Sequence, residues 1–236
     1  MFINKKSIFF LKFILQELNI TSKINKTKKF ILFDNDGVLV HTEPLYFQAN
    51  KTILKKELNL ELEFDEYMEI MARGGTAWEI ALKQNIPKEI IDKCRFKRDE
   101  LYQEYITKYD IAIPNVKKVL SKLAKNYKMA IITTSRRVDF QLIHQNRGIV
   151  DFMDFVLCVE DYTFAKPHPQ PYLKGLEKFN ASKDETIVVE DSQRGLMSAI
   201  NAKIECVIVH NEFTKTQDFS KASYKINSIE ELEKYL

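Results

Sequence analysis

The sequence predicts an α/β fold, in which a doubly wound parallel sheet carries a small α-helical second domain. Short apolar runs alternate with helix-like segments from residue 29 to the C-terminus, which is typical of a parallel sheet covered by helices on both faces. Acidic, hydroxyl and basic residues follow these runs where the strands are expected to end. Residues 43–110 interrupt the alternation and predict the second domain.

The strands are expected at five apolar runs. The first run, KFILFDND, covers residues 29–36 and ends in acids, which indicates a buried strand followed by a loop. Near the C-terminus, Ser228-Ile-Glu-Glu231 is a capping-box pattern that predicts a last helix to Leu236. The other strands are expected within residues 129–135, 154–160, 186–192 and 205–210, and helices within residues 116–126, 138–147, 172–179 and 194–202.

The interrupting segment has no convincing strand, many charges and apolar residues at helical spacing. We therefore predict an N-terminal extension over residues 1–29, a core built from residues 30–42 and 111–236, and a helical cap over residues 43–110. Because doubly wound sheets bind ligands outside the carboxyl ends of their strands, the cap is expected to cover the site.

Composition and charge narrow the class of protein. Hydrophobic residues make up 45% and charged residues 29% of the 236 residues, which is ordinary for a soluble globular protein. A net charge of +3 gives no electrostatic basis for nucleic-acid binding. This charge and the lack of a coiled-coil pattern favour a monomer. Cys94, Cys158 and Cys206 form no C-x-x-C pair, so we expect reduced, mostly buried thiols in a cytoplasmic enzyme.

Residues 1–29 are rich in lysine and contain an apolar run, Ile8 to Leu15, that Lys12 interrupts. This run is shorter than the roughly 20 residues that a membrane-spanning helix needs, so no stable membrane insertion is expected. No small-residue cleavage site follows the run, which argues against a secretory signal. Three interpretations remain: a helix packed on the body, a membrane-surface or targeting segment, and a poorly ordered extension.

The residues that follow the predicted strands combine acids, hydroxyls and a lysine. Three carboxylates gathered at strand ends repel one another unless a cation is present, and an oxygen-only cluster with room for water suits Mg²⁺. A nearby lysine and hydroxyl offer charge and hydrogen bonds to an anion, so the set predicts a phosphoryl-transfer site. Its members are Asp34 and Asp36 after the first run, Thr133 or Thr134 after the second, Lys166 in AKPHP, and Glu190 and Asp191 after TIVV.

Four segments carry motifs: FDNDGVLV with HTEPLYF (residues 33–47), IITTS (131–135), KPHPQPY (166–172) and VVEDSQRGLMSAI (188–200). In these segments the chain resembles the haloacid dehalogenase (HAD) superfamily, in the helical-cap subgroup that includes sugar phosphomutases and phosphoglycolate phosphatases. The resemblance covers residues from about 29 to 236 and implies a Rossmann-like core.

The resemblance also implies a role for each motif residue. Asp34 is expected to attack phosphorus and become an aspartyl-phosphate, while Asp36 protonates the leaving oxygen and later activates water. Thr133 is expected to hydrogen-bond a phosphoryl oxygen, with Thr134 as the alternative if the strand ends one residue later, and Lys166 neutralises charge. The implied metal ligands are Asp34, the backbone carbonyl of Asp36, and Asp191, with Glu190 as a further ligand or an acid beside it.

The acid at position 36 separates reactions within the superfamily. Phosphatases and phosphomutases carry it, dehalogenases lack it, and transport ATPases have a threonine there. We therefore predict a magnesium-dependent phosphatase that hydrolyses a small phosphorylated metabolite, such as a sugar phosphate, a phosphoglycolate-like acid or a nucleoside monophosphate. One alternative is a sugar phosphomutase, and a second is a non-catalytic protein that binds a phosphorylated metabolite.

Two loops are expected to contact the substrate. Arg73, Gly74 and Gly75 lie in the cap between two helix-like segments, where an arginine can grip a carboxylate or a second phosphate. Ser135 and Arg136 follow the second motif and are expected to contact a distal anionic group. For both arginines, a solvated position is the alternative.

Several positions depart from the superfamily pattern. Asn35 stands where an apolar residue is commoner, and either faces the substrate or is simply tolerated. His41 replaces a frequent aspartate of the hinge region. Tyr46 stands where the sugar phosphomutases carry a histidine, which ranks a mutase below a hydrolase. His144 and His210 are interpreted as ordinary surface or helix residues.

Overall fold

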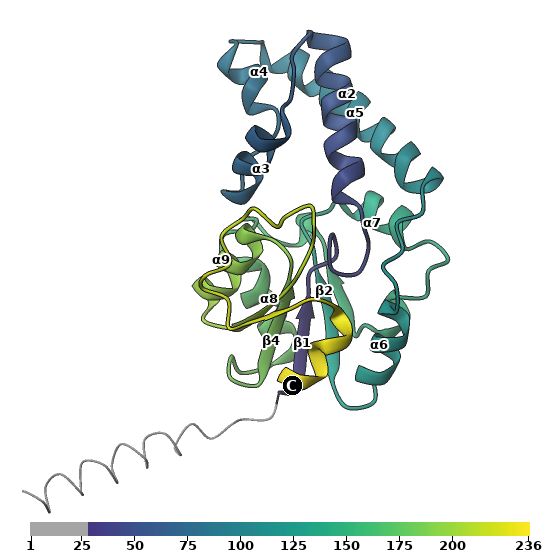
Figure 1. The fold of residues 1–236 in the computed structure, drawn as a ribbon, viewed down its shortest axis with the longest axis vertical. Coiled ribbons are helices and arrows are strands. Elements are labelled where there is room, and N and C mark those ends of the chain that lie inside the picture. The colour runs from purple at the N-terminus through teal and green to yellow at the C-terminus, as the bar shows by residue number, and fades with distance from the viewer. Residues whose placement is uncertain (1–27) are drawn as a thin grey trace, which may run out of the picture.

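The computed structural model describes residues 28–236, and a six-stranded sheet forms their centre (Figure 1). The strand order is β3-β2-β1-β4-β5-β6 and all neighbouring strands are parallel. The order runs outward in both directions from β1, which is the doubly wound arrangement that the sequence predicted. The strands are β1 (Phe30–Phe33), β2 (Lys128–Ile132), β3 (Phe155–Leu157), β4 (Thr186–Glu190), β5 (Glu205–Val209) and β6 (Tyr224–Ile226).

Helices cover both faces of the sheet. One face packs against α6 (Val116–Leu123), α7 (Arg137–His144) and the 3-10 helix η3 (Ile229–Tyr235), and the other packs against α8 (Gln170–Phe179) and α9 (Gln193–Ala202). Two short 3-10 turns, η1 (Val150–Phe152) and η2 (Val159–Asp161), flank β3. The strands are therefore buried on both sides, which explains why they read as continuous apolar runs in the sequence.

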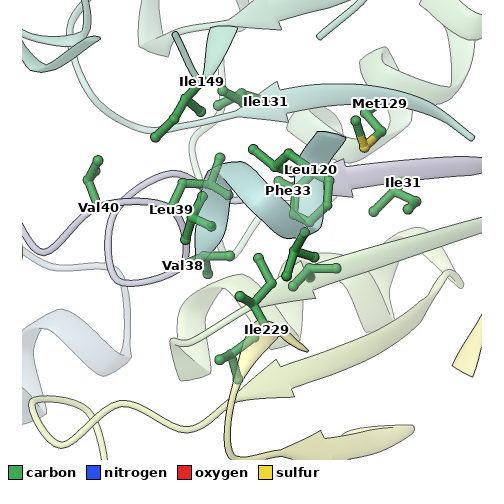
Figure 2. Close-up of a cluster of buried hydrophobic side chains, with 14 of the residues drawn as sticks. Ile31, Phe33, Val38, Leu39, Val40, Leu120, Met129, Ile131, Ile149 and Ile229 are labelled. Carbon is green, nitrogen blue, oxygen red and sulfur yellow. The ribbon is translucent and has the colours of Figure 1, made fainter. Parts of the chain in front are cut away.

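Strand β1 shows how the core fixes the loop that follows it. Ile31 and Phe33 point into the cluster on the α6 side, and Leu32 points into the cluster on the α8 side, because alternate side chains of a strand face opposite ways. Residues 38–40, just after the strand, bury their side chains in the first cluster (Figure 2). Each buried aliphatic side chain contributes roughly 1.5–3 kcal/mol, so the acid-bearing loop is anchored at both ends.

Four helices form a separate group beyond the carboxyl ends of the strands (Figure 1). The long helices α2 and α5 pack along each other. This group has its own apolar cluster, which buries Leu54, Leu62, Tyr67 and Trp78. The helices are α2 (Glu43–Leu58), α3 (Phe64–Ala72), α4 (Glu79–Lys83) and α5 (Lys88–Lys108).

The chain enters and leaves this helical group through two adjacent segments. The N–H of His41 donates to the carbonyl of Ile111 at 2.8 Å, and Val40 forms an antiparallel bridge with Ala112. The side chain of His41 itself is exposed. We propose that this paired crossing is the boundary between the core and the cap, as the sequence division at residues 42 and 111 supposes.

The C-terminus holds one element that was expected and one that was not. The predicted last helix is present as the 3-10 helix η3, whereas the strand β6 was not expected. The hydroxyl of Ser228 accepts from the N–H of Glu230, while the carboxylate of Glu231 accepts from the N–H of Asn227 at 3.1 Å. Both N–H donors lie one residue closer to the N-terminus than in a capping box.

Two further expectations concern the chain as a whole. The cysteines are buried and free, as predicted. The N-terminal extension lies outside the described residues, apart from residues 28 and 29. Among the helices of residues 28–236, none combines the length and the apolar composition that crossing a bilayer requires.

Candidate active site

The loop after β1 presents two aspartates on the side of the sheet that faces the cap. The carbonyl of Asn35 accepts hydrogen bonds from the N–H groups of residues 38–40, which folds the loop back on itself. Gly37 has a φ of +80° in this turn, and a β-carbon there would lie 2.0 Å from Oδ2 of Asp191. Glycine is therefore required by the backbone conformation and by the close approach of the acid.

Lys166 contacts the first of the two aspartates. Its ammonium group donates to Oδ1 of Asp34 at 2.6 Å and to Oε1 of Glu190 at 2.7 Å. A third hydrogen bond, to the carbonyl of Ile132, measures 2.8 Å. Burial disfavours the ammonium, but the two carboxylates outweigh burial and raise the pKa of Lys166 above its ordinary value. Lys166 is therefore a cation at neutral pH.

Asp36 accepts hydrogen bonds from three hydroxyl groups. Its Oδ2 accepts from Ser135 at 2.7 Å and from Thr133 at 3.1 Å, and its Oδ1 accepts from Thr42. The hydroxyl of Thr133 accepts in turn from the N–H of Ser135 at 3.0 Å. Hydroxyl groups rotate to donate or accept, so they can follow a change in the protonation of Asp36.

Asp34, Glu190 and Asp191 lie close enough to share one ion, because one oxygen from each falls within 4.8 Å of the others. Burial and the Glu190 carboxylate raise the pKa of Asp34 to about 7, against the opposing effect of Lys166. Burial and the neighbouring carboxylates also raise the pKa of Asp191 well above its ordinary value. When all three acids are ionised, they carry more negative charge than Lys166 neutralises.

Glu190 has its hydrogen bonds filled by the protein. Its Oε1 accepts from Lys166 and from the phenol of Tyr172 at 2.6 Å, and its Oε2 accepts from the hydroxyl of Ser192 at 3.0 Å. Burial opposes its ionisation, but Lys166 and these hydrogen bonds hold the pKa of Glu190 below its ordinary value. Glu190 therefore orients Lys166. The carboxylate oxygens that are freer to bind an ion belong to Asp34 and Asp191.

Asp191 has one oxygen without a partner. Its Oδ2 accepts from the amide of Asn211 at 2.7 Å, whereas its Oδ1 is buried and makes no hydrogen bond. A buried unpaired carboxylate oxygen is costly, and a hard divalent cation between Asp34 and Asp191 would satisfy it. The donor set therefore fits Mg²⁺, the ion that the sequence predicted from the same acids.

A cavity of about 330 Å³ opens beside these residues, between the core and the cap helices. This volume suits a small molecule. The residues that matter below are Asp36, Lys166 and Arg194 on the core side, and Tyr67, Gly74 and Arg95 on the cap side.

Most of the predicted substrate-binding residues line this cavity, namely Thr134, Ser135, Arg136, Gly74 and Gly75. The cap loop also touches the core, because a β-carbon on Gly74, whose φ is +81°, would lie 2.6 Å from the ring of Pro167.

Arg73 stands apart from the other predicted substrate-binding residues. It does not line the cavity, and its exposed guanidinium pairs with the carboxylate of Glu79. Because this acid already holds the guanidinium fork, its position argues against the predicted substrate contact.

Arg136 lines the cavity but binds acids of the protein itself. Its guanidinium donates to both oxygens of the buried Asp139 at 2.8 and 2.9 Å, and to Oδ2 of Asp99 at 2.5 Å. Asp99 belongs to α5 of the cap, whereas Arg136 belongs to the core. The arginine therefore joins the two parts and has little capacity left for a substrate anion.

His144 is the last residue of the helix α7, which is one of the two positions expected for it. It is buried, and its Nε2 lies 2.7 Å from Oδ1 of Asn35. Asn35 is itself fully buried, so it does not face the substrate. His210 is exposed and pairs with Glu212, as expected of a surface residue.

Sequence reasoning missed two charged residues of the cavity wall. Glu43 opens α2, and its Oε2 is buried without a hydrogen-bond partner. Arg194 lies in the first turn of α9. Both residues stand inside motif segments, Glu43 in HTEP and Arg194 in EDSQRG. Their closeness along the chain to the predicted acids was the only signal that could have found them.

The model of one protein family, the haloacid dehalogenase-like hydrolases, matches residues 31–209. The chain belongs to the haloacid dehalogenase-like hydrolase family. The matched segment contains all four motifs in full and spans the cap helices and the sheet up to β5. This HAD-like hydrolase is thus a phosphohydrolase, in keeping with the names of its relatives.

Named relatives and solved structures are similar over most of the chain. Pyrophosphatase PpaX of Bacillus mycoides is 28% identical over 76% of this chain and 82% of its own length. Protein CbbY of Rhodobacter capsulatus is 26% identical over 84% and 92%. The crystal structure of a HAD hydrolase, family IA, variant 3, from Entamoeba histolytica superposes with a TM-score of 0.76 at 25% identity, over 88% of this chain and 97% of that one.

Proposed function

We propose that this HAD-like hydrolase is a magnesium-dependent phosphatase that hydrolyses a small phosphorylated metabolite through an aspartyl-phosphate on Asp34. The observation that carries the proposal is the contact of Asp34 with Lys166 at 2.6 Å, with Asp36 two residues on and a small cavity beside them. A nucleophile, a proton donor and a cation for the phosphoryl group are thereby brought to one place.

In the first step, a carboxylate oxygen of Asp34 attacks phosphorus. The bond between phosphorus and the ester oxygen breaks, and Asp36 gives its proton to that leaving oxygen. In the second step, Asp36 takes a proton from a water molecule, which attacks the phosphorus of the aspartyl-phosphate and releases inorganic phosphate. The hydroxyls of Thr42 and Ser135 hold the Asp36 carboxylate in both protonation states.

Asp34 and Asp191, with the backbone carbonyl of Asp36 and with Glu190 beside them, would hold the Mg²⁺ ion. When bound, this ion neutralises charge on the phosphoryl group and on the clustered acids. Lys166 supplies a further positive charge from its buried position.

The size of the cavity favours a small substrate, and its walls favour hydrolysis over phosphomutase activity. A volume of about 330 Å³ is small for a folded phosphoprotein segment. Within residues 28–236, no histidine lines the cavity, and Tyr46 occupies the position that is histidine in sugar phosphomutases. A mutase would be revealed by an isomerised sugar phosphate, and a non-catalytic sensor by tight binding without turnover.

The test is the release of inorganic phosphate from a panel of small phosphate esters and from pyrophosphate, with and without magnesium. Pyrophosphate is included because a similar protein is named a pyrophosphatase. We expect release by the native chain with magnesium, and none above background by Asp34→Asn. Asp36→Ala should retain little turnover of esters with poor leaving groups, because the leaving oxygen then departs unprotonated.

Asp92→Asn is the matched control, because Asp92 is exposed on α5 and does not line the cavity. It should turn over the panel at the native rate. Equal turnover by Asp34→Asn and the native chain would refute the aspartyl-phosphate. A folded native chain that releases no phosphate from any compound would refute the phosphatase.

A further inference from the structure

Two arginines of the cavity wall form no ion pair with an acid of the described part of the chain. Arg95 extends from α5 of the cap, and Arg194 from the first turn of α9 in the core. The arginine ion pairs among residues 28–236 involve other arginines, at positions 73, 98, 136 and 137. The charges of Arg95 and Arg194 are therefore available to a ligand.

The remaining cations of the cavity wall are already paired. Lys166 is shared between Asp34 and Glu190, and Arg136 is held by two acids of the protein. An anion that enters the cavity can thus gain a new ion pair from Arg194 without breaking an existing one.

The position of Arg194 indicates which part of a substrate it meets. Its Nη2 donates to the hydroxyl of Thr134 at 3.4 Å, and this hydrogen bond leaves most of its five N–H donors unused. Burial disfavours its charge, but Asp34 and its other neighbours raise the pKa of Arg194. The other carboxylates that act on it are Glu190 and Glu43, and the guanidinium lines the same cavity as Tyr67 of the cap helix α3.

We propose that Arg194 binds a second anionic group of the substrate, a carboxylate or phosphoryl group other than the phosphoryl group transferred to Asp34. A guanidinium binds either group through paired hydrogen bonds, and Arg95 adds positive charge from the cap side. The inference rests on the proposed phosphatase activity and narrows it to small phosphate esters with two anionic groups. Thr134 orients the guanidinium, which gives this predicted substrate residue a positioning role.

Three compounds with one two-carbon skeleton separate the charge of the second group from the size of the substrate. They are 2-hydroxyethyl phosphate, whose far end is neutral, phosphoglycolate, which carries a carboxylate, and ethane-1,2-diol bisphosphate. Steady-state kinetics with magnesium are measured for the native chain, Arg194→Met and Arg194→Lys. Phosphoglycolate and the bisphosphate distinguish a carboxylate from a phosphoryl group as the second anion.

We expect the native chain to prefer one or both of the compounds that carry a second anionic group. Arg194→Met should lower kcat/KM for the preferred compound by about 10- to 100-fold, which is typical of a lost charged hydrogen bond. It should change kcat/KM for 2-hydroxyethyl phosphate by less than about threefold. Arg194→Lys should retain part of the preference, because a lysine keeps the charge and loses the fork.

Arg147→Met is the matched control, because Arg147 lies outside the cavity and donates to the carbonyl of Ile143. It should leave the preference among the three compounds intact. An equal loss on all three compounds in Arg194→Met would overturn the inference, because it would place the arginine on the transferred group or in the fold. No preference in the native chain would overturn it as well.

Binding separates this inference from the proposed function. Calorimetry with the Asp34→Asn protein measures affinity for the three compounds without turnover. Tighter binding of a compound with a second anionic group than of 2-hydroxyethyl phosphate, lost when Arg194→Met is added, supports the inference even if no ester is hydrolysed. Equal affinities for all three compounds would overturn it while leaving the phosphatase proposal standing.

Discussion

The imidazole Nε2 of His144 lies 2.7 Å from Oδ1 of Asn35, and this pair is buried directly behind the two aspartates of the first motif. Asn35 stands between Asp34 and Asp36, so its side chain points into the core while theirs reach the site. Oδ1 of Asn35 can only accept, and His144 must therefore donate from Nε2. Nδ1 of the same ring and Nδ2 of the amide have no partner.

Removing one member of this pair should cost more than removing both. His144→Leu leaves Oδ1 of Asn35 buried and unpaired, so we expect the free energy of unfolding to fall by about 1–3 kcal/mol. Asn35→Leu with His144→Leu replaces both polar groups and their two unpaired nitrogens, and should lie within about 1 kcal/mol of the native chain. Urea denaturation measures both. Additive losses in the double variant would show that the pair is not a unit.

The same pair should make stability depend on pH. Burial lowers the pKa of His144 to about 4, below its ordinary 6.5 in the unfolded chain. Between these values the unfolded chain binds the extra proton, so stability is lost as the pH falls from about 6.5 toward 4. The contribution is about 3 kcal/mol. It is measured as the difference in unfolding free energy between the native chain and the double variant at each pH. A difference that stays constant from pH 7 to pH 4 would contradict it.

The sheet and the main acids could be predicted because both depend on local sequence. Strands buried on two faces read as apolar runs, and the carboxyl ends of parallel strands share one edge. Asp34, Lys166 and Asp191 therefore come together once the strands are recognised. The edge strand β6 was missed because its three residues, YKI, are mostly exposed and carry no such run.

The direction of charged side chains could not be predicted in the same way. Arg73 pairs with an acid six residues away, and Arg136 with one 37 residues away in the cap. The partner of Asn35 lies 109 residues along the chain. These pairings depend on how helices pack against each other. For the same reason the sequence offered Arg73 as a substrate contact and did not single out Arg194, which lines the cavity.

Arg136 pairs with Asp99 of the cap and with Asp139 of the core, and the two ion pairs should contribute unequally to stability. Arg136→Met leaves the buried carboxylate of Asp139 with the amide of Gln103 as its remaining side-chain donor, at 2.8 Å. We expect a loss of about 3 kcal/mol in the free energy of unfolding. Asp99→Asn removes a charge that pairs with Arg136 and also with the buried Arg98 at 2.8 Å, but its amide oxygen still accepts a hydrogen bond, so we expect a smaller loss of about 1–2 kcal/mol. Thermal or urea unfolding compares the two, and equal losses would mean that the contact with the cap carries the effect.

The substitution Asp191→Asn should have opposite effects on thermal stability with and without magnesium. In the metal-free chain, burial and the charges of Glu190 and Asp34 raise the pKa of Asp191, and folding bears the cost of that shift. Asp191→Asn removes the ionisable group and with it this cost, so the variant should unfold at a higher temperature than the native chain. Magnesium should then stabilise the native chain by about 2.7 kcal/mol at one hundred times its dissociation constant, and the variant by much less. The order of melting temperatures should therefore reverse as magnesium is added, while Asp92→Asn follows the native chain throughout. An equal upward shift in the native chain and Asp191→Asn would place the ion elsewhere.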